Sequence, residues 1–251
     1  MINIKGCHPT RQMALIGGTH AREWIGDAVV LWTLGCITEL YDKDKNLTQV
    51  LDSLDLYICP CYNPDGYTYS RTVDRLWRKN RRVNGDGTFG VDQNRNWDVD
   101  WGNGCPNDTS SLVYCGPGAF SEPEPRAMND FLRSLPNLSS IIDFHSPQKR
   151  IVRPYSYINE TCPDETLLFN IGYRFVVDYY SVHGTKLENA RGCDLYVHSG
   201  GCTDYNYISG VKNVFILELL GDNFALPESE IQKQGEEAFA GIRYLLERAL
   251  K

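Results

Sequence analysis

Two kinds of hydrophobic pattern alternate along the chain. Short, mainly apolar runs are typical of buried strands, and they occupy residues 12–17, 54–59, 138–144, 151–155 and 213–219. Between them, apolar residues recur every three or four positions, which predicts helices at residues 24–41, 121–135, 163–180 and from 227 onward. The alternation favours one α/β domain, with a twisted sheet of mixed parallel and antiparallel strands and helices on both faces.

The middle of the chain departs from both patterns. Residues 67–121 carry little periodicity and are rich in Gly, Asn, Asp and Arg. Long irregular stretches inside a compact domain are usually functional. The stretch is bounded by Asn63-Pro64-Asp65-Gly66, which predicts a turn, and by Ser121-Glu122-Pro123-Glu124, which predicts a capping box at a helix start.

Composition excludes several classes of function. A chain of 251 residues suffices for one domain with a sizeable core. The net charge is −7 and there is no basic stripe, so we expect no nucleic-acid partner. No apolar run is long enough to cross a membrane, so we expect no membrane span.

The nine cysteines and the glycosylation sequons bear on the compartment. Cys105 and Cys115 bracket one short loop and Cys193 and Cys202 another, so we expect two local disulfides, with reduced buried thiols as the alternative. Four Asn-x-Ser/Thr sequons favour a secreted glycoprotein, and they begin at Asn46, Asn107, Asn137 and Asn159. No signal peptide is visible at the start, so we expect the signal to lie outside this chain.

Three residues at two strand ends have the chemistry of a metal site. His20 and Glu23 follow the strand at 12–17, and His145 follows the strand at 138–144. On spacing alone, His-x-x-Glu is more often a surface pair. Open α/β sheets, however, bind ligands where strands end, and two imidazoles with one carboxylate hold zinc while leaving one position open for water. We therefore predict a catalytic zinc site.

Hydrolytic chemistry at zinc needs further charged groups. Glu218 lies inside the apolar run 214–219, where a carboxylate must be paired or functional; a buried Glu paired with arginine is the alternative. Several arginines fall in the irregular middle stretch and would suit a developing oxyanion or an anionic substrate group, unless they only form a solvated surface. They are Arg75, Arg78, Arg81, Arg82 and Arg95.

With these residues placed, the chain resembles the catalytic domain of the metallocarboxypeptidase A/B family. Carboxypeptidase A is itself a known His2Glu zinc enzyme, so the ligand count is also what the resemblance implies. The matching segments keep the family's order over nearly the whole chain: His20-Ala21-Arg22-Glu23-Trp24, Asn63-Pro64-Asp65-Gly66-Tyr67, Trp77-Arg78-Lys79, Asp92-Gln93-Asn94-Arg95-Asn96-Trp97, Phe120-Ser121-Glu122-Pro123-Glu124, His145-Ser146, Tyr196 with Ser199-Gly200-Gly201, and Glu218.

The resemblance implies a zinc-dependent exopeptidase that cleaves the C-terminal peptide bond of peptides and proteins. His20, Glu23 and His145 would bind one zinc ion, and Asp92 would accept a hydrogen bond from a ligand histidine. Glu218 would act as general base on the zinc-activated water.

The remaining implied roles concern the substrate. Arg78 would stabilise the oxyanion, while Asn94 and Arg95 would bind the substrate's terminal carboxylate. Tyr196 would close over the substrate from a mobile loop, and Arg22 would serve subsites further along the peptide. A fixed carboxylate clamp beside the metal explains why only the last peptide bond would be cleaved.

In this family, the preference for the substrate's C-terminal side chain depends on the residue seven positions after the tyrosine that closes over the substrate. That residue is Asp in enzymes that prefer Lys or Arg. Here it is Thr203, and with His198 and Ser156 as further candidate wall residues we expect a preference for neutral side chains. We expect Arg191 to be an exposed loop arginine, with a role in binding acidic ends as the alternative. Leu220 and Pro147 also depart from the family pattern.

The resemblance covers residues 1–251 as one zinc carboxypeptidase catalytic domain that lacks the family's first strand and helix. It implies a monomer and a possible pro-domain outside this chain. Two alternatives stay open. A catalytically silent binding protein would have lost a ligand or Glu218, which is not so here. A zinc amidase or deacylase of small acylated amino acids would not need the substrate clamp.

Overall fold

Seven strands form a single sheet in this computed structural model, which describes residues 1–251. Strands β3, β2, β4 and β7 run parallel, β1 is antiparallel to β3, and the pair β5 and β6 is antiparallel to β7. The mixed sheet predicted from the sequence is thus confirmed. The spatial order is β1 (Ile2–Ile4), β3 (Leu54–Cys59), β2 (Arg11–Gly17), β4 (Leu138–His145), β7 (Asn213–Glu218), β5 (Arg150–Arg153) and β6 (Glu188–Arg191).

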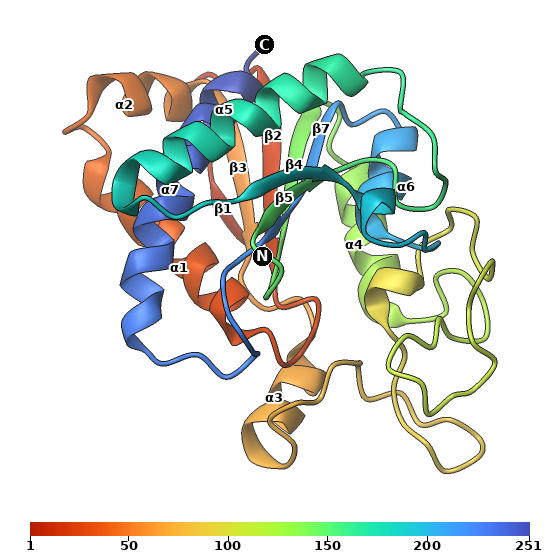
Figure 1. The fold of residues 1–251 in the computed structure, drawn as a ribbon. Coiled ribbons are helices and arrows are strands. Elements are labelled where there is room, and N and C mark those ends of the chain that lie inside the picture. Colours follow the sequence, from red (N-terminus) through yellow and green to blue (C-terminus); the bar gives the residue numbers. More distant parts are fainter.

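Helices cover both faces of the sheet, and Figure 1 shows α4 and α6 on the side opposite α1, α2, α5 and α7. Neither layer contains a helix long and apolar enough to cross a membrane. The α-helices are α1 (Trp24–Leu40), α2 (Lys45–Asp52), α3 (Pro64–Thr72), α4 (Pro123–Arg133), α5 (Glu165–His183), α6 (Cys202–Ile208) and α7 (Ser229–Ala249), and two short 3-10 turns span Gln93–Arg95 and Gly192–Asp194.

The three central strands explain the mainly apolar runs. Strands β2 and β4 have parallel neighbours on both sides, and β7 has one parallel and one antiparallel neighbour. Helices cover both faces of these strands, so nearly all their side chains are buried. Each buried aliphatic side chain contributes roughly 1.5–3 kcal/mol relative to its exposed state. This burial fixes the register of the strands, and the register in turn fixes which residues emerge at their carboxyl ends.

Two local predictions at the borders of the middle stretch were wrong. The predicted turn at 63–66 is the start of α3, where the Asn63 side chain accepts a hydrogen bond from the Gly66 amide at 3.0 Å. The predicted capping box does not form, since the N-cap residue of α4 is Glu122 and no side chain caps the helix. The Glu122 carboxylate instead accepts hydrogen bonds from Asn80 Nδ2 at 2.7 Å and Arg82 Nη1 at 2.9 Å.

One of the two expected disulfides is present. Cys105 and Cys115 are bonded, but Cys193 and Cys202 are free, so the second prediction was wrong. Cys202 begins α6 and is buried in the core, where its sulfur accepts a hydrogen bond from Asn206 Nδ2 at 3.4 Å. No disulfide therefore links the two ends of the segment from 193 to 202.

Candidate active site

The candidate site lies where β2, β4 and β7 end. Because these neighbouring strands are parallel, their carboxyl ends meet at one edge of the sheet. His145 ends β4 directly beside Glu218, which ends β7. His20 follows β2 by three residues, and Glu23 is the N-cap residue of α1. The fold thus brings together four residues that are up to 198 positions apart in sequence.

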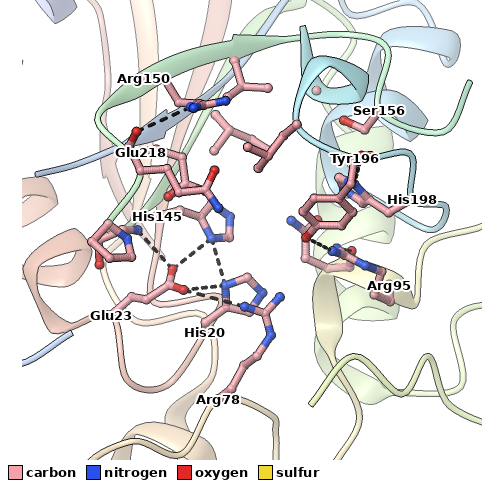
Figure 2. Close-up of a pocket in the computed structure, with 18 of the residues that line it drawn as sticks. His20, Glu23, Arg78, Arg95, His145, Arg150, Ser156, Tyr196, His198 and Glu218 are labelled. Carbon is pink, nitrogen blue, oxygen red and sulfur yellow. Dashed lines mark hydrogen bonds and ion pairs between the residues drawn. The ribbon is translucent and has the colours of Figure 1, made fainter. Parts of the chain in front are cut away.

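His20, Glu23 and His145 converge on one point, as Figure 2 shows. Their exposed fractions are only 5%, 3% and 1%. Glu23 Oε1 lies 2.9 Å from His20 Nδ1, Glu23 Oε2 lies 3.0 Å from His145 Nδ1, and the two Nδ1 atoms are 3.0 Å apart.

The outer nitrogens of both histidines face carboxylates. His20 Nε2 lies 3.2 Å from Asp92 Oδ1, and His145 Nε2 lies 2.9 Å from Asp143 Oδ2. Asp143 was not predicted from the sequence. The signal available was a carboxylate inside the apolar run 141–144, two residues before His145 and so on the same strand face.

This arrangement fits a metal cation. If each Nε2–H donates to its carboxylate, both Nδ1 atoms present lone pairs to each other at 3.0 Å and to the Glu23 carboxylate. Such a cluster of acceptors is repulsive without a cation between them. The donor set of two imidazoles and one carboxylate, with no sulfur, suits zinc with an open position.

Charges around the set are strongly coupled. Burial disfavours ionised Glu23, but His20 and His145 outweigh it and hold the pKa of Glu23 well below its usual range. Burial also opposes the charge of Asp92, yet Arg78 and His20 lower its pKa well below the usual value. Glu218 differs, because burial raises its pKa to about 7. One of its oxygens, Oε2, has no hydrogen-bond partner.

Arg78 lies beside the metal set. Its Nε and Nη2 donate to Asp92 Oδ2 at 3.1 and 2.7 Å, and its Nη1 is 3.9 Å from Glu23 Oε1. Burial opposes its charge, but Asp92 and Glu23 raise the pKa of Arg78 above its usual value. Arg78 is therefore a fixed cation at the cavity wall.

Arg95 and Tyr196 face the metal set across the cavity (Figure 2), which Asn94 also lines. Arg95 Nη2 donates to the Tyr196 hydroxyl at 2.7 Å, and Arg95 Nη1 donates to the Asn94 carbonyl at 2.6 Å. Asn94 Oδ1 accepts from the Cys202 amide at 2.9 Å, which leaves the Asn94 amide nitrogen without a partner. Donors for an anion thus point into the cavity.

Only some of the other predicted substrate residues line the cavity. Arg22 and His198 line the cavity, and burial together with Arg95 lowers the pKa of His198 to about 3, so its ring is neutral. Thr203 is buried and is not among the lining residues. Arg191 was expected in an exposed loop, but it lies in the cavity wall, where it forms an ion pair with Asp194 at 2.6 Å.

Pro147 and Leu220, the two departures from the family pattern, lie in different surroundings. Pro147 and Ser156 line the cavity, whereas Leu220 packs against the hydrophobic core. Sequence reasoning also missed Arg150, which lines the cavity and pairs with Glu188 at 2.9 Å. Arg150 begins β5, and this position could have pointed to the cavity only if the strand order had been known.

Comparison with known proteins agrees with this geometry. The family model described as zinc carboxypeptidase matches residues 5–241. The chain belongs to the zinc carboxypeptidase family. It is similar to carboxypeptidase A4 of Mus musculus, with 36% identity over 239 residues, 93% of this chain and 57% of the relative. Carboxypeptidase B of Homo sapiens is 35% identical over 241 residues, 93% of this chain and 58% of the relative.

Solved structures show the same zinc carboxypeptidase architecture. The crystal structure of thrombin activatable fibrinolysis inhibitor matches with a TM-score of 0.92 at 35% identity, covering 96% of this chain and 62% of that chain. A carboxypeptidase A from Helicoverpa armigera matches with a TM-score of 0.86 at 25% identity, covering 96% and 61%. The chain thus spans a little over half of the length of the curated relatives it matches.

Proposed function

We propose that the protein is a zinc-dependent carboxypeptidase that hydrolyses the C-terminal peptide bond of peptides and proteins. The main supporting observation is that one cavity holds the His20–Glu23–His145 set, Glu218 and the guanidinium of Arg95, whose hydrogen bonds go to neutral acceptors and not to a carboxylate. One three-residue set of this kind is present, which supports a single zinc ion. When bound, zinc would make a water nucleophilic near neutral pH and polarise the scissile carbonyl.

Glu218 suits the role of general base. It lies in the cavity beside His145, and its pKa of about 7 means that it can both accept and release a proton near neutral pH. In the proposed reaction it accepts the proton of the attacking water and delivers it to the leaving amine. Arg78 presents a fixed cation on the same side of the cavity, where it would stabilise the oxyanion.

The opposite wall would determine which bond is cleaved. The guanidinium of Arg95 and the free amide nitrogen of Asn94 can bind the terminal carboxylate, and the Tyr196 hydroxyl lies next to them. Tyr196 is 48% exposed, so neighbouring side chains leave space for it to close over a bound substrate. Arg22, further along the cavity, would contact upstream residues of the peptide.

We further propose a preference for neutral C-terminal side chains. The two arginines in the distal wall, Arg150 and Arg191, are paired with Glu188 and Asp194, so neither offers an uncompensated charge to an acidic side chain. No carboxylate among the lining residues besides Glu23 and Glu218 is available to bind a basic one. The buried Thr203 fits this preference but does not form the wall.

The protein is also proposed to be a secreted monomer. A disulfide between Cys105 and Cys115 is typical of proteins from oxidising compartments. All four sequon asparagines are exposed and accessible to glycosylation, and they are Asn46, Asn107, Asn137 and Asn159.

The test is release of C-terminal residues from a mixed peptide library by the zinc-loaded chain, with and without a chelator. We expect chelator-sensitive release of neutral residues, and we expect E218Q to lower the rate about 10²–10⁴-fold while it stays folded. Release of Lys, Arg, Asp or Glu would keep the reaction and refute the preference. No release by folded, zinc-loaded protein would refute the carboxypeptidase and favour a silent binding protein.

An N-acyl amino acid series separates the amidase alternative. A carboxypeptidase needs the Arg95 clamp for peptides, so R95A should lose activity on every peptide substrate. If wild-type protein cleaved only small N-acyl amino acids, the amidase would replace the peptidase as the proposed function.

A further inference from the structure

Asp143 is a buried carboxylate to which neither the sequence nor the proposed reaction gives a role. It lies on β4 two residues before His145, is 1% exposed, and its Oδ2 is 2.9 Å from His145 Nε2. We infer that Asp143 is a positioning residue that holds His145 as a zinc ligand in the required tautomer and orientation. This inference rests on the proposed function, because it assumes that zinc binds the set.

The tautomer follows from the contacts of the ring. Carboxylates face both ring nitrogens of His145, Asp143 at Nε2 and Glu23 at Nδ1. When Glu23 and the Nδ1 lone pair bind the metal, Asp143 is the acceptor left for the one N–H of a neutral imidazole, and it holds that proton on Nε2. Without that acceptor, the proton would also populate Nδ1 and block the ligand position.

Asp143 and Asp92 support their histidines differently. Asp92 shares its charge with Arg78, which donates twice to Oδ2, and with the Asn94 amide on Oδ1 at 3.0 Å. Asp143 has no arginine or lysine within 4 Å. Its charge is therefore directed mainly at His145, which increases the basicity of Nδ1 and strengthens the bond to a metal.

Thr19 fixes Asp143 in place and links the two ligand segments. Its hydroxyl donates to Asp143 Oδ1 at 2.9 Å, and Thr19 directly precedes His20. Both side chains are buried, at 2% and 1% exposure, so water does not compete for this hydrogen bond. The segment after β2 and the end of β4 are thus joined by a Thr19–Asp143–His145 chain.

The experiment measures zinc affinity of the full chain by competition with a chromogenic chelator, together with the thermal stability of the metal-free protein. D143N keeps the shape and an acceptor oxygen but removes the charge, so we expect about 10- to 100-fold weaker zinc binding. T19V should weaken binding less, because Asp143 remains. The control is D55N, which alters a buried carboxylate that accepts from the Gly6 amide and contacts no ligand histidine.

The readouts separate positioning from general stability. If Asp143 positions His145, D143N loses zinc affinity beyond any change in the stability of the metal-free protein, and NMR of the D143A histidines shows mixed tautomers. Equal zinc affinity of D143N and wild type would overturn the inference alone. A wild-type chain that binds no zinc would overturn the proposed function and this inference together.

Discussion

At the scale of single residues, Asp204 should make stability depend on pH. It is fully buried, accepts from the Ser156 and Tyr157 amides, and burial raises its pKa from 3.8 to about 6. Between these values Asp204 holds more protons in the folded chain than in the unfolded chain, so its contribution to stability is fully present below pH 4 and is lost as pH rises through 6. The loss attributable to Asp204 is about 3 kcal/mol. Denaturant unfolding of wild type and D204N across this range measures it.

The matched comparison is Asp44, whose pKa is shifted the other way. The Leu47 amide and Arg243 lower the pKa of this half-buried N-cap residue of α2, so its contribution is present above the usual pKa and is lost as pH falls. D204N should therefore flatten the decline toward pH 6, and D44N should flatten the decline toward low pH. If both variants give curves parallel to wild type, the assignment of these slopes is wrong.

Residue chemistry decided which parts of the site could be predicted. Histidines and carboxylates beside apolar strands are costly to bury unless they are paired or bind a ligand. That cost made it possible to select His20, Glu23, His145 and Glu218 from the sequence. Asp143 could not, since its partner His145 Nε2 is defined only by the ring orientation in the folded chain. The pairing of Arg150 with Glu188 in the cavity wall could not be predicted either, because it depends on which strands are neighbours.

At the scale of elements, the position of α1 against β4 should control metal binding. A Cβ on Gly26 would come within 3.0 Å of the Phe144 carbonyl oxygen, part of a central strand that cannot move easily. G26A should push the first turn of α1, and Glu23 with it, away from His145. We expect a loss of about 1–3 kcal/mol in unfolding free energy and weaker zinc binding. Chemical unfolding and chelator competition measure the two effects.

Gly35 offers a control in the same helix. It is exposed, and an added Cβ would meet nothing within 4 Å. G35A should therefore raise the unfolding free energy by about 0.5–1 kcal/mol and leave zinc affinity unchanged, because alanine favours helix over glycine. Equal effects of G26A and G35A would show that the approach of α1 to β4 does not position Glu23.

Elements were predictable in proportion to their local signal. The runs that form β2, β3, β4 and β7 are mainly apolar, and the helices α1, α5 and α7 are long and periodic. The missed elements are short and polar or exposed, and pairing or packing with distant segments stabilises them instead; they are β1, β6, α2, α3 and α6. Strand β6, for example, reads Glu188-Asn189-Ala190-Arg191 and is a strand because it pairs with β5.

At the scale of the whole molecule, the alternation of strand and helix signals predicted the layered α/β architecture, which the structure confirms. Strand order could not be predicted, because nothing local says that β4 pairs with β2 or β7 with β4. That order is what makes the site, since it turns His20, His145 and Glu218 into neighbours. The resemblance to a known family supplied the grouping that the periodicity could not.

The same order predicts that zinc stabilises the whole fold. Its ligands come from the segment after β2, the start of α1 and the end of β4, so the unfolded chain cannot present them together. Free zinc at 1,000 times its dissociation constant should add about 4 kcal/mol to the unfolding free energy. For a chain of this length that raises the unfolding temperature by roughly 8–16 °C, which calorimetry with zinc and with chelator would measure. E23Q, which keeps the shape but loses the charged ligand, should lose most of the shift; an undiminished shift would mean that zinc stabilises the protein from a different site.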